Sequence, residues 1–463
     1  MIMNLEKLFR AKNIAVWWSG RNRGEILSLV FLFLIALGLR LYFQHESIVA
    51  EHIISDAREY TIAGYNIYRW DVFSTLAPSS PETAPDPNAK RSPGYPLFLS
   101  LFFHISQSPF QFIRWVTTSQ AVLGSLSAML SFLMARFMLN RVWSFFVGLL
   151  TALSPHLIAS DFYLLTESLF TFVLLAGTVL LFFSWSKGNP VGSLFSGAFF
   201  GAAMLIRPIA IFIGPFMAVT YLLGGKIWDP AKRTVTVKQI LFFFLGILLI
   251  FGPFPVRNKA VLGQMLPEDT RAWNSMIDGS YIDLKYKNPQ FWGYPNKDDP
   301  ENSRMKKEKT YFFQVLMRRL RDRPWDYVKW YLGGKVLCSW GWDLVSGQHD
   351  VYVYPMIRMG FHDNPFLKII HTVMRGIHPL LVLLAFATLS SFLLIKRIRL
   401  AHEKGIFLVP VFLIMAYHAV LLTLMLPLPR YTIPLRPYCY LAALTGLYFL
   451  KESMKKSLRS RFN

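Results

Sequence analysis

Long apolar stretches constrain the fold of this chain more than any other feature of its sequence. The two clearest run over 26–43 and 367–395, and each is long enough to cross a hydrocarbon core of about 30 Å. Charged residues make up 16% of the chain, whereas soluble domains carry roughly 25%. Much of the surface must therefore face lipid, and the sequence predicts an all-α, polytopic membrane protein.

Two ambiguous segments decide the number of crossings. Segment 191–223 holds Arg207-Pro208 at its middle, and because proline breaks a helix, a hairpin of two short helices is expected there. Segment 96–105 is short for a span, so it is expected to lie on or dip into the outer face. Together with the other apolar segments, these two assignments predict a bundle of about ten to eleven transmembrane helices. The remaining apolar segments are 111–135, 142–159, 167–185, 239–254, 371–395, 406–426 and 431–450.

The positive charge of the chain follows its membrane topology. The formal net charge is +22, and Lys and Arg gather between the apolar segments, as residues retained in the cytoplasm do. No basic soluble domain interleaved with aromatic residues is present, so nucleic acid is not an expected partner. The expected location is the bacterial inner membrane, with both termini cytoplasmic and no cleaved signal. The two cysteines, Cys338 and Cys439, predict no disulfide.

The expected organisation has five parts and two long outer loops. Because long loops usually carry function, the chemistry is expected on the periplasmic face. The parts are a cytoplasmic N-terminus (1–25), an N-terminal transmembrane catalytic module (26–254) with a periplasmic loop (44–93), a second periplasmic loop with helices near 308–320 and 324–337 (255–370), C-terminal transmembrane helices (371–450) and a cytoplasmic tail (451–463).

Two acids are candidate catalytic residues. Asp56 follows the first span, and Glu167 opens the helix expected over 169–183, so both should lie at the outer membrane boundary. A carboxylate there can accept a proton from a hydroxyl or hold a divalent cation. Each also has a structural interpretation, because acids cap helices and are favoured in their first turn.

Arginines at the same boundary depart from the positive-inside bias. Arginine binds phosphate through two parallel hydrogen bonds, so their group indicates a lipid-phosphate site, although each alone could snorkel or pair with an acid. The candidates are Arg91, Arg207, Arg257 and Arg430, with the adjoining Tyr431.

No cofactor or metal is assigned from the sequence. His349, His362 and His371 lack the close spacing of metal ligands, so no zinc site is expected, and a divalent cation has no support. The chain also lacks a Walker A motif, a dinucleotide-binding glycine fingerprint and a Gly-x-Ser-x-Gly elbow. An activity that draws on a soluble nucleotide is therefore unsupported.

The order of short motifs resembles the C-type membrane glycosyltransferases. It is most similar to the family 39 group of protein O-mannosyltransferases and lipid A aminoarabinose transferases. The motifs are Asp56 after the first span, Arg91-Ser92-Pro93-Gly94-Tyr95-Pro96-Leu97, Thr166-Glu167-Ser168-Leu169-Phe170, Leu205-Ile206-Arg207-Pro208, Pro255-Val256-Arg257-Asn258 and Arg430-Tyr431-Thr432-Ile433-Pro434.

This resemblance implies a fold of the C type, a polyprenyl-phosphate-sugar donor and an acceptor that approaches from the periplasm. It places the catalytic carboxylate at Asp56 and a second acid at Glu167, where relatives often have Asp. The lipid-phosphate cations fall on Arg91 and Arg207, where some relatives have Lys, and less firmly on Arg430. Many relatives act without a metal.

The leading hypothesis is a membrane glycosyltransferase, either hexosyl or pentosyl, whose acceptor is a lipid, a glycan or a protein. Asp56 would take the acceptor proton while the arginines hold the leaving phosphate. One alternative is a transporter or flippase of a lipid-linked sugar, although charges at the midplane and repeated halves, which are typical of transporters, are not seen. The other is a non-catalytic scaffold of the cell envelope.

Overall fold

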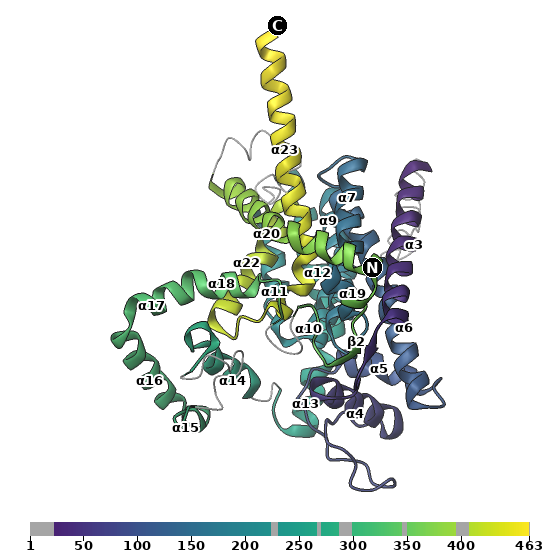
Figure 1. Ribbon diagram of the computed structural model, residues 1–463, viewed down its shortest axis with the longest axis vertical. Helices are drawn as coiled ribbons and strands as arrows, with labels where there is room; N and C mark the ends of the chain where they lie inside the picture. Colours follow the sequence, from purple (N-terminus) through teal and green to yellow (C-terminus); the bar gives the residue numbers. More distant parts are fainter. Residues whose placement is uncertain are drawn as a thin grey trace.

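The computed structural model describes residues 23–223, 230–265, 270–286, 299–344, 350–394 and 407–462. Some of the sequence predictions concern residues outside these ranges. They are the basic N-terminal segment, the connections 226–229 and 396–404, and His349. Figure 1 shows an upright bundle of helices with shorter helices gathered at its lower end. The last helix, α23 (Arg436–Phe462), projects beyond the upper end.

The predicted all-α membrane architecture is confirmed. Within the described residues, five helices are long and apolar enough to cross a membrane, so the chain is a multi-pass membrane protein. Shorter apolar helices lie among them. The long candidates are Arg23–Glu46, Pro109–Ala135, Glu167–Lys187, Val235–Leu262 and Pro365–Phe392; the shorter ones are Gly94–Phe103, Arg141–Leu153, Pro190–Ile206, Pro208–Thr220 and Leu408–Leu424.

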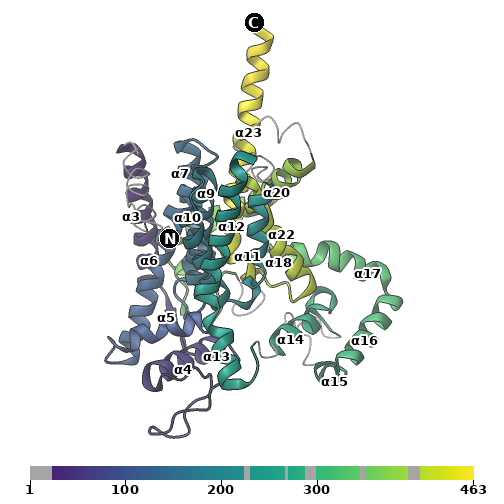
Figure 2. The ribbon, with the colours of Figure 1, turned by 180° about the vertical axis from the view of Figure 1, so that it is seen from behind.

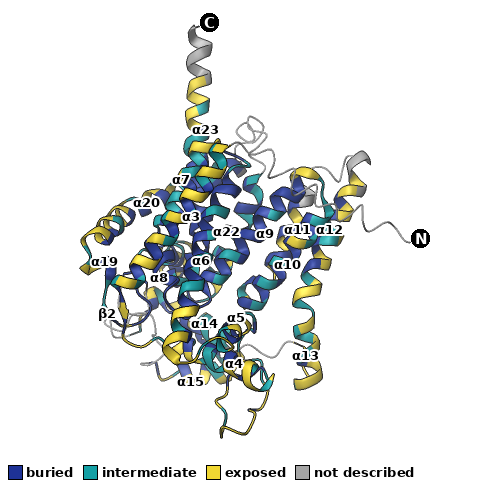
Figure 3. Ribbon diagram, turned by 90° about the vertical axis from the view of Figure 1, so that its right-hand side faces the viewer, coloured by how far each residue is buried: buried dark blue, intermediate teal, exposed yellow. Residues whose placement is uncertain are grey.

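The most deeply buried span is α9 (Glu167–Lys187). α3 (Arg23–Glu46) packs on α6 (Pro109–Ala135) and α7 (Arg141–Leu153), and α6 packs on α9. In its most apolar window α9 is 83% buried, whereas α3 is 33% buried, so α9 is the core helix and α3 faces lipid. Figure 3 shows the same contrast, with α9 dark and α3 partly exposed.

Proline divides two of the expected segments. The segment expected over 142–159 is split into α7 and α8 (Pro155–Ser160), because Pro155 starts a new helix. The segment expected over 431–450 begins later, at Arg436, because the proline-rich stretch before it forms a 3-10 helix, η6 (Pro429–Leu435). Proline there removes backbone donors that an α-helix needs.

The hairpin expected around Arg207 is present. α10 (Pro190–Ile206) ends where Arg207 adopts an extended backbone, and a short 3-10 turn, η1 (Pro208–Ala210), leads into α11 (Ile213–Leu223). α12 (Pro230–Phe251) then returns alongside α10 and continues into α13 (Pro253–Leu262). The break places Arg207 between α10 and η1.

A lateral arm follows α13, and Figure 2 shows it extending away from the bundle. The two helices expected here are present, although a π-helical turn interrupts the second. The arm has its own small core of Ile277, Tyr281, Met305, Phe312 and Val315. Its elements are α14 (Thr270–Gly279), η2 (Ile282–Leu284), α15 (Asn302–Lys307), α16 (Lys309–Asp322), α17 (Pro324–Lys329), the π-helix η4 (Trp330–Gly334) and α18 (Lys335–Ser339).

The chain then returns across the lower end of the bundle. Strand β2 (Met356–Arg358) pairs antiparallel with β1 (Ile48–Val49), which directly precedes α4 (Ser55–Trp70). α5 (Gly94–Phe103) has ten residues and packs on α4. The remaining helices are α19 (Gly360–Asp363), α20 (Pro365–Leu394) and α22 (Leu408–Leu424).

Candidate active site at the lower end of the bundle

Asp56 lies in the first turn of α4 and does not cap it. The N-cap is Ile54, which offers no side-chain hydrogen bond, so the capping interpretation of Asp56 finds no support. Ser55, the residue before it, has a positive φ of 49°, a conformation that L-residues rarely adopt. The backbone N–H of Ala57 donates to the Tyr354 hydroxyl at 3.2 Å. The Asp56 carboxylate instead contacts Arg91 and Arg430.

Arg91 connects two carboxylates of α4. Its Nη2 pairs with Oδ1 of Asp56, and its Nε donates to Oε2 of Glu59 at 2.6 Å. The guanidinium also lies over the Tyr60 ring, 4.8 Å from the centroid. Arg91 sits just before α5, so the packing of α5 on α4 brings it to these acids.

Glu167 holds two further arginines. Its Oε1 lies 2.6 Å from Nη2 of Arg207 and 2.6 Å from Nε of Arg430. Arg207 also donates from Nε to the Thr166 hydroxyl at 2.7 Å. Only 1% of the Glu167 side chain is exposed, so its carboxylate is closed to an incoming substrate.

Arg430 contacts both Glu167 and Asp56. Besides Glu167, it binds Oδ2 of Asp56 through Nη1 at 3.3 Å. Glu59 receives two more cations, Lys90 and Arg271. Five cations thus surround three carboxylates, which leaves an excess of two positive charges at one end of the bundle. Such a cluster is suited to an anionic ligand.

The arginines also control the protonation of the acids. Burial acts to raise the pKa of Asp56, but the guanidinium groups of Arg430 and Arg91 outweigh it, so the pKa is below its ordinary value. The pKa of Glu59 is lowered in the same way, because hydrogen bonds from Lys90 and Arg91 overcome the effect of burial. Both groups are therefore charged at neutral pH.

Two of the residues expected at the phosphate site lie elsewhere. Arg257, on α13, donates to the carbonyl oxygens of Asn88 and Phe73 at 3.2 Å and 3.1 Å, so its guanidinium fastens the 71–93 loop. Tyr431 packs against an apolar cluster that contains Leu428 and Trp330. The structure brings Asp56, Glu167, Arg91, Arg207 and Arg430 together, and their catalytic roles stay predictions.

A pocket of about 230 Å³ opens beside Pro429, the neighbour of Arg430. Trp330 and Trp342 line it together with the carboxylates of Asp283 and Asp343. Aromatic faces and carboxylates suit the stacking and hydrogen bonding of a sugar or another polar acceptor.

The fold is that of the C-type membrane glycosyltransferases. The archaeal oligosaccharyltransferase AglB from Archaeoglobus fulgidus, in complex with an inhibitory peptide and a dolichol-phosphate, superposes with a TM-score of 0.54 at 12% identity, over 95% of this chain and 52% of that one. The same enzyme tethered to an acceptor peptide gives a TM-score of 0.55 at 12% identity, over 94% and 50%. The chain thus spans about half the length of these oligosaccharyltransferases.

The sequence comparison points in the same direction. Residues 90–256 match the family model described as dolichyl-phosphate-mannose-protein mannosyltransferase, so the resemblance drawn from the ordered motifs is confirmed. Among solved structures, a weaker likeness is to ArnT from Cupriavidus metallidurans bound to undecaprenyl phosphate, with a TM-score of 0.45 at 13% identity, over 92% of this chain and 60% of that one. No curated protein matches the chain by sequence.

Two groups of residues were not predicted. Glu59 and Arg271 join the site although neither was singled out from the sequence; Glu59 lies one helical turn after Asp56, and this spacing alone could have suggested a shared face. Asp350, His362 and His371 also converge, although the spacing of the histidines predicted no metal site. They come from a loop and two helices, so only the tertiary fold brings them together.

Proposed function

We propose that the chain is a glycosyltransferase that moves a sugar from a polyprenyl-phosphate donor to an acceptor on the periplasmic face of the inner membrane. The observation that carries this proposal is the excess of positive charge around Asp56, in a bundle of the C-type fold. The names of the matched family and of the AglB complex support a lipid-phosphate donor.

In this proposal the donor phosphate binds Arg91, Arg207 and Arg430. The three guanidinium groups already share the carboxylates of Asp56 and Glu167. A phosphate can therefore replace some of these contacts. A preorganised set of cations stabilises the charge that develops on the leaving phosphate without reorganisation during the reaction.

Asp56 then acts as the base. The acceptor hydroxyl gives its proton to the Asp56 carboxylate while its oxygen attacks the anomeric carbon. The bond between that carbon and the phosphate oxygen breaks, and its electron pair leaves with the phosphate. About a third of the Asp56 side chain is exposed (33%), so an acceptor can reach it.

Donor binding would also strengthen this base. In the free protein, Arg91 and Arg430 lower the pKa of Asp56 and so make it a weak proton acceptor. A phosphate that neutralises those cations raises the pKa again, so the base becomes effective once the donor is in place. Glu167 is a positioning residue, because it is buried and acts through Arg207 and Arg430.

The test is donor turnover by the purified full-length protein in detergent. Synthetic polyprenyl-phosphate hexoses and pentoses are supplied with an extract of envelope acceptors, and mass spectrometry follows released polyprenyl phosphate and glycosylated product. Asp56→Asn should lower the rate by about 10² to 10⁴, the usual contribution of a general base. Asp71→Asn is the matched control, since Asp71 is exposed at the other end of α4.

Near-normal turnover by Asp56→Asn, at an unchanged amount of protein in the membrane, would remove the proposed base. Because detergent leaves no sealed compartment, product formation also separates transfer from transport. A protein that formed no product with any donor, yet moved lipid-linked sugar across vesicles, would be a transporter.

A further inference from the structure

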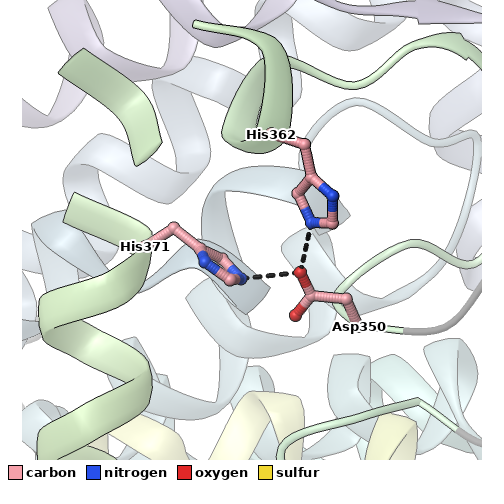
Figure 4. Close-up of side chains that lie close together, drawn as sticks. All are labelled: Asp350, His362 and His371. Carbon is pink, nitrogen blue, oxygen red and sulfur yellow. Dashed lines mark hydrogen bonds and ion pairs between the residues drawn. The ribbon is translucent and has the colours of Figure 1, made fainter. Parts of the chain in front are cut away.

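Three metal-binding side chains meet beside the candidate active site. Asp350 belongs to the loop after α18, His362 to α19 and His371 to α20, and their ligand atoms all lie within 4.8 Å of one another. Figure 4 shows both imidazole rings pointing at the same carboxylate. Within the described residues, this is the group of His, Cys, Asp and Glu side chains that could hold a metal ion.

The carboxylate is oriented as metal ligands usually are. Its Oδ1 accepts a hydrogen bond from Trp342 Nε1 at 2.5 Å, which leaves Oδ2 facing the two histidines. Nε2 of His362 and Nε2 of His371 each lie 2.7 Å from that oxygen. A donor outside the ligand set that fixes the orientation of a ligating side chain is a regular feature of metal sites.

Both imidazoles approach the same carboxylate oxygen. His371 is 6% exposed, and its Nε2 and that of His362 both lie against Oδ2 of Asp350. A cation at the meeting point would use the lone pairs of both nitrogens and Oδ2 together.

We propose that Asp350, His362 and His371 bind a divalent transition metal, with zinc as the best fit. Two imidazoles and one carboxylate form a three-residue zinc set, with water in the fourth position. His362 is exposed, so that position can open to solvent. Ligands of one tetrahedral zinc ion stand about 3.3 Å apart, so small outward movements of the two rings admit the ion.

The metal would fasten the loop that forms one wall of the candidate active site. Asp350 precedes β2, which pairs with β1 just before α4. Tyr354, between Asp350 and β2, accepts the Ala57 N–H beside Asp56, and Trp342, bound to Asp350, lines the pocket near Pro429. Metal binding itself does not depend on the proposed function; only its effect on turnover does.

The first measurement is the metal content of the purified full-length protein by inductively coupled plasma mass spectrometry. About one zinc per chain is expected, and His362→Ala should lose it. His362 is the informative variant because it is exposed, so its removal leaves the core intact. His104→Ala, which replaces another exposed histidine, should keep the metal.

The second measurement is thermal unfolding after chelation. Wild type and His104→Ala should melt at a lower temperature after chelation and recover when zinc alone is returned, since a ligand that binds only the native state stabilises it. His362→Ala should respond to neither treatment. Asp350→Asn should bind zinc more weakly in a titration of chelated protein.

Three results would overturn the proposal: a protein without metal whose melting temperature ignores added zinc, a stoichiometric metal that persists in both His362→Ala and Asp350→Asn, or substoichiometric metal that dialysis removes. These outcomes are separate from the fate of the proposed function. Asp56→Asn should retain its zinc, so a failed transfer assay does not bear on the metal, and an absent metal does not bear on Asp56.

Discussion

Arg430 is the residue on which the electrostatics of the candidate site depend. It contacts both Asp56, on α4, and Glu167, at the start of α9. A charge placed between two acids holds both ionised, and burial strengthens the interaction. The reactivity of Asp56 is therefore determined by what else binds its arginine partners.

This coupling predicts the pH dependence of turnover. Activity needs the Asp56 carboxylate, so it is present above the pKa of that group and is lost as the pH falls through it. Since the free protein holds this pKa below its ordinary value, the acid limb of kcat/KM should lie at lower pH than that of kcat. The former reports the free enzyme and the latter the donor complex.

The two limbs are measured in the detergent assay over a pH series, with Asp71→Asn as control. The control should reproduce both limbs of the wild type. A kcat limb at the lower pH, or coincident limbs, would mean that the donor phosphate does not compete with Asp56 for the arginines.

At the scale of elements, small residues allow α10 and α12 to pack backbone against backbone. A Cβ at Gly197 would overlap the Phe243 carbonyl, and a Cβ at Gly246 would overlap the Leu194 carbonyl. Helices in lipid associate through such close approaches, because the hydrophobic effect does not drive them together. This packing fixes the position of α10, and Arg207 lies directly after the last residue of that helix.

Gly246→Ala should therefore destabilise the protein by roughly 1–3 kcal/mol, the usual cost of overpacking. Gly38→Ala is the matched control, since no atom lies within 4 Å of a Cβ at Gly38. Thermal unfolding of the detergent-solubilised variants compares them. Equal melting temperatures would show that α10 and α12 can separate without cost.

For the whole molecule, the important fact is that the site gathers at one end of the bundle. α4, α5, α13 and the 71–93 loop lie at the lower end in Figure 1, whereas the connection between α6 and α7 and the end of α23 lie at the upper end. Cations of the upper connections, such as Arg136 and Arg141, belong in the cytoplasm by the positive-inside rule. This rule therefore predicts that the site faces the periplasm.

Cysteine labelling tests this orientation. In a chain whose Cys338 and Cys439 are replaced, Ser79→Cys should react with a membrane-impermeant maleimide added outside spheroplasts. Arg141→Cys should react only after the membrane is opened; both positions are exposed. The reverse labelling pattern would place the site in the cytoplasm and end the proposal of a periplasmic acceptor.

The sequence alone determined the helical membrane class, the break at Arg207 and the order of motifs that contain Asp56, Arg91 and Glu167. These are local properties, because hydropathy, proline geometry and short motifs act over a few residues along the chain. The apolar segment at 431–450 does not coincide with one α-helix, because hydropathy marks an apolar run and does not register that Pro434 requires another backbone.

Only the tertiary structure decided which charges meet. Arg257 and Arg430 follow similar patterns in the sequence, yet one binds loop carbonyls and the other binds two acids. The meeting of Asp350, His362 and His371 was equally hidden, because the segments that carry them are arranged by packing. Coulomb interactions and ligand geometry depend on distances in space, and distance along the chain does not determine these.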